Sequence, residues 1–99
     1  MDRLDCDRML VAVLETGSFA AAAVRLGTSS GQASKLVSRL EAELGARLLN
    51  RTTRQLMPTE HGSVFYEGAK TVLEAITEAE AAVSALSGQP RGTIRITAP

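Results

Sequence analysis

The sequence predicts a mainly α-helical fold in which three short helices and a two-stranded hairpin precede one long helix. Gly17, Gly27 and Gly45 each follow a segment with helical apolar spacing, and glycine is favoured just past a helix end. Pro58 ends the hairpin, because proline cannot continue a hydrogen-bonded ladder. Residues 59–87 then keep a heptad-spaced apolar pattern, which is typical of a helix that pairs with another helix.

Apolar spacing and caps predict the first two helices. The first runs from about Arg3 to Thr16, with an inward stripe of Leu4, Met9, Leu10, Val13 and Leu14. Cys6 belongs to this helix, and we expect it to be a small, partly buried residue. Ser18 suits the N-cap of the second helix, the alanine-rich segment 19–26. Alanine allows close backbone approach, so this helix suits a place between two others.

A third helix is predicted from Ser29 to about Leu44. Ser29 at the N-cap and Gln32 three residues later match a capping box. One face of this helix is apolar and is expected to be buried, through Ala33, Leu36, Val37, Leu40 and Leu44. The opposite face presents Ser30, Gln32, Ser34, Lys35, Ser38 and Arg39. Two helices joined by a short glycine-containing turn form a helix-turn-helix, whose second helix usually reads DNA.

A wing is predicted after the third helix. Leu48–Leu49 and Gln55–Met57 are its expected strands, with residues 50–54 between them. The tip carries two arginines and two hydroxyl groups, which suit phosphate oxygens. The alternative is an ordinary solvated hairpin tip, and the helix-turn-helix that precedes it favours the wing.

The long helix is predicted from Thr59 to about Ser87. At ~1.5 Å per residue it would be roughly 43 Å long, which exceeds the expected width of the body. We expect its apolar seam to form a homodimer interface through Phe65, Ala69, Val72, Ile76, Ala79, Val83 and Leu86. The spacing leaves open whether the paired helices run parallel or antiparallel.

The predicted elements divide the chain into three regions. Residues 1–58 form the winged helix-turn-helix, and residues 59–87 form the linker and dimerisation helix. Residues 88–99 contain a glycine- and proline-rich hinge, followed by an alternating segment at 93–97 that resembles a strand. Because a lone strand needs a partner, we expect it to be the first strand of a missing C-terminal effector domain.

Composition argues against several function classes. The chain has one cysteine and one histidine, and it lacks a Gly-x-Ser-x-Gly turn and a glycine-rich phosphate loop. We therefore expect no enzyme activity, no metal and no cofactor. His61 is expected to be a surface residue of the long helix. No apolar run is long enough to cross a bilayer, and the start lacks a signal segment, so we expect a cytoplasmic protein with no membrane contact.

Charge is distributed unevenly, although the net charge of the chain is zero. Residues 28–58 hold five basic and two acidic residues, a local charge of +3, whereas residues 59–87 hold one basic and five acidic residues, a local charge of −4. A local basic patch matters more for DNA binding than the total charge does. The helix-turn-helix and wing are thus the expected DNA-binding region.

The chain resembles the LysR-type transcriptional regulators over nearly all of its 99 residues. The resemblance is carried, in order, by Glu15-Thr16-Gly17-Ser18-Phe19, Ala22-Ala23-Val24-Arg25-Leu26, Ser34, Leu40-Glu41, Glu43-Leu44-Gly45, Arg47-Leu48, Arg51-Thr52-Thr53-Arg54, Pro58-Thr59-Glu60 and Gly62. It implies a winged helix-turn-helix whose linker helices pair antiparallel in a dimer. It also implies a tetramer for the full-length protein, and a small-molecule co-inducer that acts only through the C-terminal domain.

Candidate DNA contacts follow from the polar face of the third helix and from the resemblance. Base contacts are expected from Ser30, Gly31, Gln32, Ser34 and Lys35. Phosphate contacts are expected from Thr28, Ser29, Ser38, Arg39, Arg51, Thr53 and Arg54. Helix capping is an equal alternative for Thr28, Ser29 and Gln32, and an ion pair with Glu43 is the alternative for Arg39.

One departure from the family pattern concerns base preference. The family often has Gln-Pro where this chain has Ser30-Gly31. Serine is a shorter and less discriminating reader than glutamine, which can bond adenine through two hydrogen bonds. Gln32 is a candidate replacement reader.

The function that these patterns predict is sequence-specific DNA binding by a dimeric transcriptional regulator. The third helix would enter the major groove of double-stranded DNA at a pseudo-palindromic promoter site, while the wing follows the backbone. The alternative is a winged-helix protein-interaction module that dimerises through its long helix.

Overall fold

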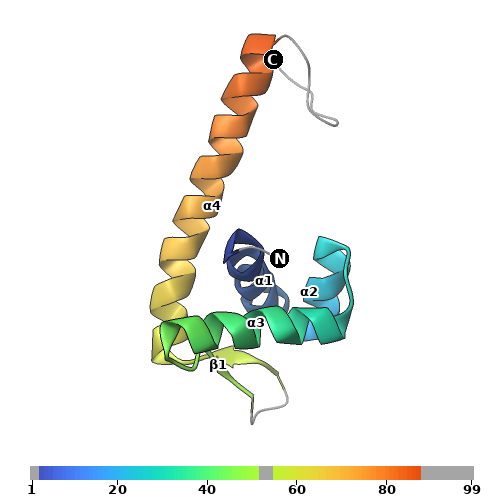
Figure 1. Ribbon diagram of the computed structural model, residues 1–99, viewed down its shortest axis with the longest axis vertical. Coiled ribbons are helices and arrows are strands. Elements are labelled where there is room, and N and C mark those ends of the chain that lie inside the picture. The colour runs from blue at the N-terminus through green and yellow to red at the C-terminus, as the bar shows by residue number, and fades with distance from the viewer. Residues whose placement is uncertain (1–2, 52–54, 88–99) are drawn as a thin grey trace.

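The computed structural model describes residues 3–51 and 55–87. Its elements, in chain order, are α1 (Arg3–Thr16), α2 (Phe19–Leu26), α3 (Ser30–Leu44), β1 (Leu49–Asn50), β2 (Met57–Pro58) and α4 (Glu60–Ser87). Figure 1 shows α1, α2 and α3 grouped into a body, the hairpin beside α3, and α4 projecting away from both. This winged helix-turn-helix with a long final helix confirms the predicted fold class, and the molecule extends over 48 × 23 × 21 Å.

The ends of the first three helices agree with the predicted caps. The Ser18 hydroxyl accepts the N–H of Ala21 at 3.0 Å, and the Ser29 hydroxyl accepts the N–H of Gln32 at 3.1 Å. The second bond is the Ser29 half of the predicted capping box. Gly45 ends α3 with a φ of 68°, a conformation that a Cβ would strain. Short-range sequence signals thus determine where these helices begin and end.

The core lies where α1, α2 and α3 meet and extends to the start of the hairpin. Its buried side chains are Cys6, Met9, Leu10, Ala12, Val13, Ala22, Ala23, Ala33, Leu36, Val37, Leu40, Leu48 and Leu49. Leu4 and Leu14 of the predicted stripe are half-buried. Cys6 is fully rather than partly buried, and burial raises the pKa of its thiol. Leu44, which was expected inside, is exposed because it ends α3 where the chain turns at Gly45.

Both strands of the wing end one residue further along the chain than predicted, and the second is one residue shorter. Leu49 pairs with Pro58, and Asn50 pairs with Met57, in an antiparallel ladder. Leu48 accepts the N–H of Thr59 at 3.0 Å in the register of this ladder, but it is not a strand residue because its own N–H donates to the Glu41 carboxylate at 2.8 Å. The Leu56 N–H is likewise engaged, since it donates to the Gly17 carbonyl at 3.3 Å. Contacts to other elements therefore replace the strand pairing that was expected at both residues.

The start of α4 is packed closely against the chain before β1. The Thr59 hydroxyl accepts the N–H of Gly62 at 3.0 Å and donates to the Arg47 carbonyl. Gly62 is buried, and a Cβ placed on it would lie 2.0 Å from the Leu48 carbonyl oxygen. Further along α4, Phe65 packs partly against the core. No helix in the described part of the chain has the length and apolar character that crossing a membrane requires.

A polar network joins α4 to the ends of α1 and α2. One carboxylate oxygen of Glu15 accepts a hydrogen bond from Arg25 at 2.6 Å, and the other accepts the Tyr66 hydroxyl at 2.9 Å. The bond from Arg25, together with that from Tyr66, holds the pKa of Glu15 below its usual value. The bond to Glu15 raises the pKa of Tyr66, and the Lys70 ammonium lies 5.8 Å from the centre of the Tyr66 ring.

Replacing Gly62 by alanine tests the close approach of α4. We expect Gly62→Ala to lower the free energy of unfolding by about 2 kcal/mol or more, because the new Cβ meets backbone that has to shift. Gly68→Ala is the matched control in the same helix, since no atom lies within 4 Å of its Cβ position. Alanine there should stabilise the fold by about 0.5–1 kcal/mol. Urea unfolding measures the free energy of unfolding of both variants. Equal changes for Gly62→Ala and Gly68→Ala would contradict the close packing of Gly62 against Leu48.

Candidate nucleic-acid interface

The polar face of α3 carries all the residues that were predicted to read bases. Ser30, Gly31 and Lys35 are exposed, whereas Gln32 and Ser34 are half-buried. The buried stripe of Ala33, Leu36, Val37 and Leu40 fixes the rotation of the helix, so this polar face points away from the core. A Cβ at Gly31 would meet nothing within 4 Å, which leaves open space at the start of the face.

The first turn of α3 suits an anion. Ser29 and Ser30 are exposed and Thr28 is half-buried. Unpaired backbone N–H groups and the helix dipole both favour negative charge at a helix start. The Ser29 hydroxyl is already engaged as the N-cap. The predicted capping role of Ser29 is therefore present in the free chain.

Arg39 and Ser38 lie one turn further along α3, and both are exposed. Arg39 forms the ion pair with Glu43 that was the alternative interpretation, with Nε 3.7 Å from Oε2. Both side chains are exposed, at 58% and 42%. Exposed pairs contribute only about 0–1 kcal/mol, so a phosphate can replace Glu43 at little cost.

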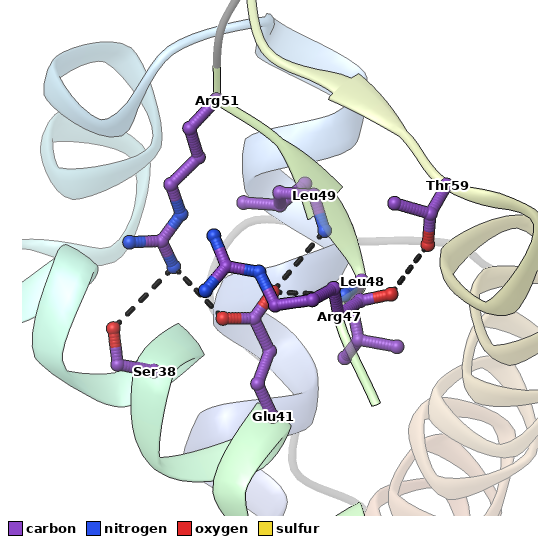
Figure 2. A network of polar contacts seen from close by, with 7 residues as sticks. All are labelled: Ser38, Glu41, Arg47, Leu48, Leu49, Arg51 and Thr59. Carbon is purple, nitrogen blue, oxygen red and sulfur yellow. Dashed lines mark hydrogen bonds and ion pairs between the residues drawn. The ribbon is translucent and has the colours of Figure 1, made fainter. Parts of the chain in front are cut away.

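Arg51, at the end of β1, is folded back onto α3 (Figure 2). Its Nη2 lies 3.1 Å from Glu41 Oε1 and 3.4 Å from the Ser38 hydroxyl. The guanidinium also lies over the Phe19 ring, 5.4 Å from its centre, and Nε is buried without a hydrogen-bond partner. The structure thus gives Arg51 a role in holding the wing against α3, which the sequence interpretation missed. Thr53 and Arg54 lie outside the described residues.

Glu41 is the centre of the contact between α3 and the wing, and its side chain is only 7% exposed. Oε2 accepts the N–H of Leu48 at 2.8 Å and that of Leu49 at 3.2 Å, while Oε1 faces Arg51. Figure 2 shows these partners converging on the carboxylate. A signal for this role was in the sequence, because Glu41 follows Val37 by four residues, in register with the buried face.

The apolar seam of α4 is divided between two surroundings. Phe65 and Ala69, near its start, are covered by the body of the same chain. Beyond them Val72, Val83 and Leu86 are exposed at 52%, 66% and 90%, Ala79 is exposed and Ile76 is half-buried. An open groove of about 590 Å³ lies between α1 and α4 and is lined by Val11, Lys70, Leu73, Glu74, Thr77 and Glu78.

Groups of acidic, histidine and cysteine side chains that could hold a metal ion are absent from residues 3–51 and 55–87. Cys6 is buried and its thiol pKa is raised, which disfavours the reactive thiolate. The polar groups gathered at α3 are hydroxyls, amides and cations, which suit nucleic-acid oxygens and base edges.

Removing the charge of Glu41 tests its structural role. We expect Glu41→Gln to lower the free energy of unfolding by about 2–4 kcal/mol, because the buried amides and Arg51 lose a charged acceptor. Glu43→Gln on the same helix is the control, and its exposed pairs should cost at most about 1 kcal/mol. Urea unfolding measures the free energy of unfolding of both variants. A Glu41 effect as small as that of Glu43 would contradict this assignment.

The chain matches a known protein family and several of its members. The family model described as "Bacterial regulatory helix-turn-helix protein, lysR family" matches residues 7–63. An HTH-type transcriptional regulator of Xanthomonas campestris pv. campestris (strain 8004) is 46% identical over 91 residues, which are 92% of this chain and 26% of the relative. The chain spans about a quarter to a third of the length of the curated relatives it matches.

Solved structures agree with the sequence matches. The BenM DNA-binding domain in complex with catB site 1 DNA has a TM-score of 0.82 and 31% identity, covering 92% of this chain and all of that one. The CbnR DNA-binding domain in complex with DNA has a TM-score of 0.76 and 33% identity, covering 88% of this chain and 99% of that one. The family match spans α2, α3, the wing and the start of α4, which are the elements that build the polar face and hold the wing beside it. The predicted resemblance is thus confirmed, and the chain belongs to the lysR family of bacterial regulatory helix-turn-helix proteins.

Proposed function

We propose that this chain is the DNA-binding part of a transcriptional regulator that recognises a specific double-stranded sequence. The observation that carries the proposal is the exposed polar face of α3, which begins at a helix N-terminus and has the wing held beside it by Glu41. An α-helix with such a face fits the major groove. The DNA complexes of similar domains, BenM and CbnR, support this reading.

Base discrimination is assigned to Ser30, Gly31, Gln32, Ser34 and Lys35, and phosphate contacts to Thr28, Ser29, Ser38 and Arg39. Thr53 and Arg54 remain proposed phosphate contacts on the evidence of the sequence. Arg51 also remains a proposed phosphate contact, because only its Nη2 engages the Glu41 carboxylate and its side chain is 27% exposed. We therefore assign Arg51 both to positioning the wing and to binding phosphate.

Dimerisation is assigned to the part of the apolar seam of α4 that lies beyond Ala69, from Val72 to Leu86. Val72, Val83 and Leu86 expose apolar surface, and a second copy of α4 would cover it. The groove between α1 and α4, whose lining includes the apolar side chains of Val11 and Leu73, lies along the same part of α4. Two-fold symmetry then requires a pseudo-palindromic site with half-sites separated by whole helical turns.

The remaining parts of the proposal concern the full-length protein. It acts in the cytoplasm, assembles as a tetramer and responds to a small-molecule co-inducer through a C-terminal domain. These assignments rest on the family and on the fraction of the relatives' length that this chain spans. The hinge and strand proposed for residues 88–99 lie outside the described residues.

Fluorescence anisotropy with DNA selected from a random-sequence library tests DNA recognition. We expect Ser34→Ala to narrow the affinity gap between selected and scrambled DNA, since a base contact contributes about 1–3 kcal/mol of discrimination. Arg39→Gln should instead weaken all sequences alike and reduce the slope of log affinity against log salt by about 1. Arg8→Gln, which removes an exposed arginine from α1, is the charge-matched control and should leave the slope unchanged.

The outcomes separate the candidate functions. If the selection enriches no sequence and the chain binds scrambled DNA equally well, the interface is a non-specific cationic surface. A folded dimer that binds no DNA even at low salt would contradict the proposal and favour a protein-interaction module.

Sedimentation velocity tests the dimer. Val83→Asp places a charge on the exposed seam, so we expect it to shift the chain from dimer to monomer at micromolar concentration while the helical content stays the same. Ala81→Asp adds the same charge two residues away, off the seam, and should leave the dimer intact. Dissociation by both variants, or by neither, would contradict the assigned interface.

A further inference from the structure

The Glu15, Arg25 and Tyr66 network joins α1, α2 and α4, and its residues belong neither to the proposed DNA contacts nor to the proposed dimer seam. Glu15 is at the end of α1, Arg25 is in the last turn of α2, and Tyr66 is in the second turn of α4. The two oxygens of the Glu15 carboxylate have separate partners, at 2.6 Å and 2.9 Å. Arg25 therefore orients the carboxylate that receives the Tyr66 hydroxyl.

Neighbouring residues of α4 are attached to opposite ends of α1. Tyr66 bonds Glu15 near the C-terminal end of α1, and Phe65 lies under the Arg3 guanidinium at its N-terminal end, with 6.0 Å from Arg3 Cζ to the ring centre. A change in the crossing angle of the two helices strains one or both of these contacts. The pair of contacts therefore resists rotation of α4 against the body.

We propose that the Tyr66–Glu15–Arg25 network sets the tilt of α4 on the body, and through it the distance between the two recognition helices of the dimer. Tyr66 and Glu15 are then positioning residues for half-site spacing, although neither has to touch DNA. This inference rests on the proposed function, because it requires the α4 dimer.

Because α4 is long, a small change in its tilt displaces one end of the helix by several ångströms. The attachments to the body described above lie between Gly62 and Ala69, whereas Leu86, at 90% exposure, lies about 30 Å from Tyr66 along the helix. Over about 30 Å, a tilt of about 6° displaces one end by roughly 3 Å. Successive base pairs of DNA are ~3.4 Å apart, so a small loss of angular control corresponds to about one base pair of spacing.

A purely stabilising role is the competing explanation, and half-site spacing distinguishes the two. Loss of stability alone lowers the fraction of folded protein and weakens all duplexes alike. Loss of angular control instead changes the ratio of affinities for duplexes that differ only in spacing. It leaves the affinity for an isolated half-site unchanged.

The test compares duplexes that carry the selected half-sites at the selected spacing and at spacings one and two base pairs longer or shorter. Anisotropy titrations use the wild type, Tyr66→Phe, Glu15→Gln and the control Thr71→Val. The control removes a hydroxyl from the same helix, and that hydroxyl bonds only the Glu67 carbonyl within α4. Thermal unfolding establishes that each variant is folded at the assay temperature.

We expect Tyr66→Phe and Glu15→Gln each to reduce the preference for the selected spacing over its one-base-pair neighbours at least three-fold. Affinity for a single half-site should stay within two-fold of the wild type, and Thr71→Val should keep the full preference. Folded variants that both retain the wild-type preference would overturn the inference, as would a wild type that binds specifically without any spacing preference. A wild type that binds no sequence specifically would instead contradict the proposed function itself.

Discussion

The buried carboxylate of Glu41 is the interaction on which the DNA-binding surface depends. A two-stranded ladder of two residues per strand is too short to be stable alone, so other contacts have to position the wing. Glu41 supplies them by accepting the N–H groups of Leu48 and Leu49 and by pairing with Arg51. An unpaired charge at this depth would cost several kcal/mol, and the wing is therefore held where its partners satisfy the carboxylate.

The same short segment also receives α4, so three functional parts meet at one place. Leu48 gives its N–H to Glu41 on α3 and its carbonyl to the N–H of Thr59. The buried Gly62 brings the first turn of α4 against that carbonyl. The helix α3, the wing and α4 consequently meet at one junction. A displacement at this junction changes the position of the wing against α3 and the start of α4 together.

The sequence interpretation succeeded where structure depends on neighbours in the chain. Caps and apolar spacing predicted the bounds of α1, α2 and α3, and the phase of the buried stripe predicted which face of α3 is polar. The interpretation failed where partners that are distant in the chain determine the structure. The amides of Leu48 and Leu56 bond Glu41 and Gly17 instead of extending the strands, and no local pattern indicates this. For the same reason the ion pair of Arg51 with Glu41 was missed, because its partner lies ten residues earlier on another element. The phosphate contact expected of Arg51 stays a prediction.

Amide hydrogen exchange at the junction tests most directly whether Glu41 joins the wing and the recognition helix into one unit. If it does, the Leu48 and Leu49 amides exchange as slowly as the amides of Val37 and Leu40 in α3, because all of them open only with global unfolding. Exchange at Leu48 and Leu49 that is orders of magnitude faster, while α3 stays protected, would show a wing that opens independently and would contradict this account.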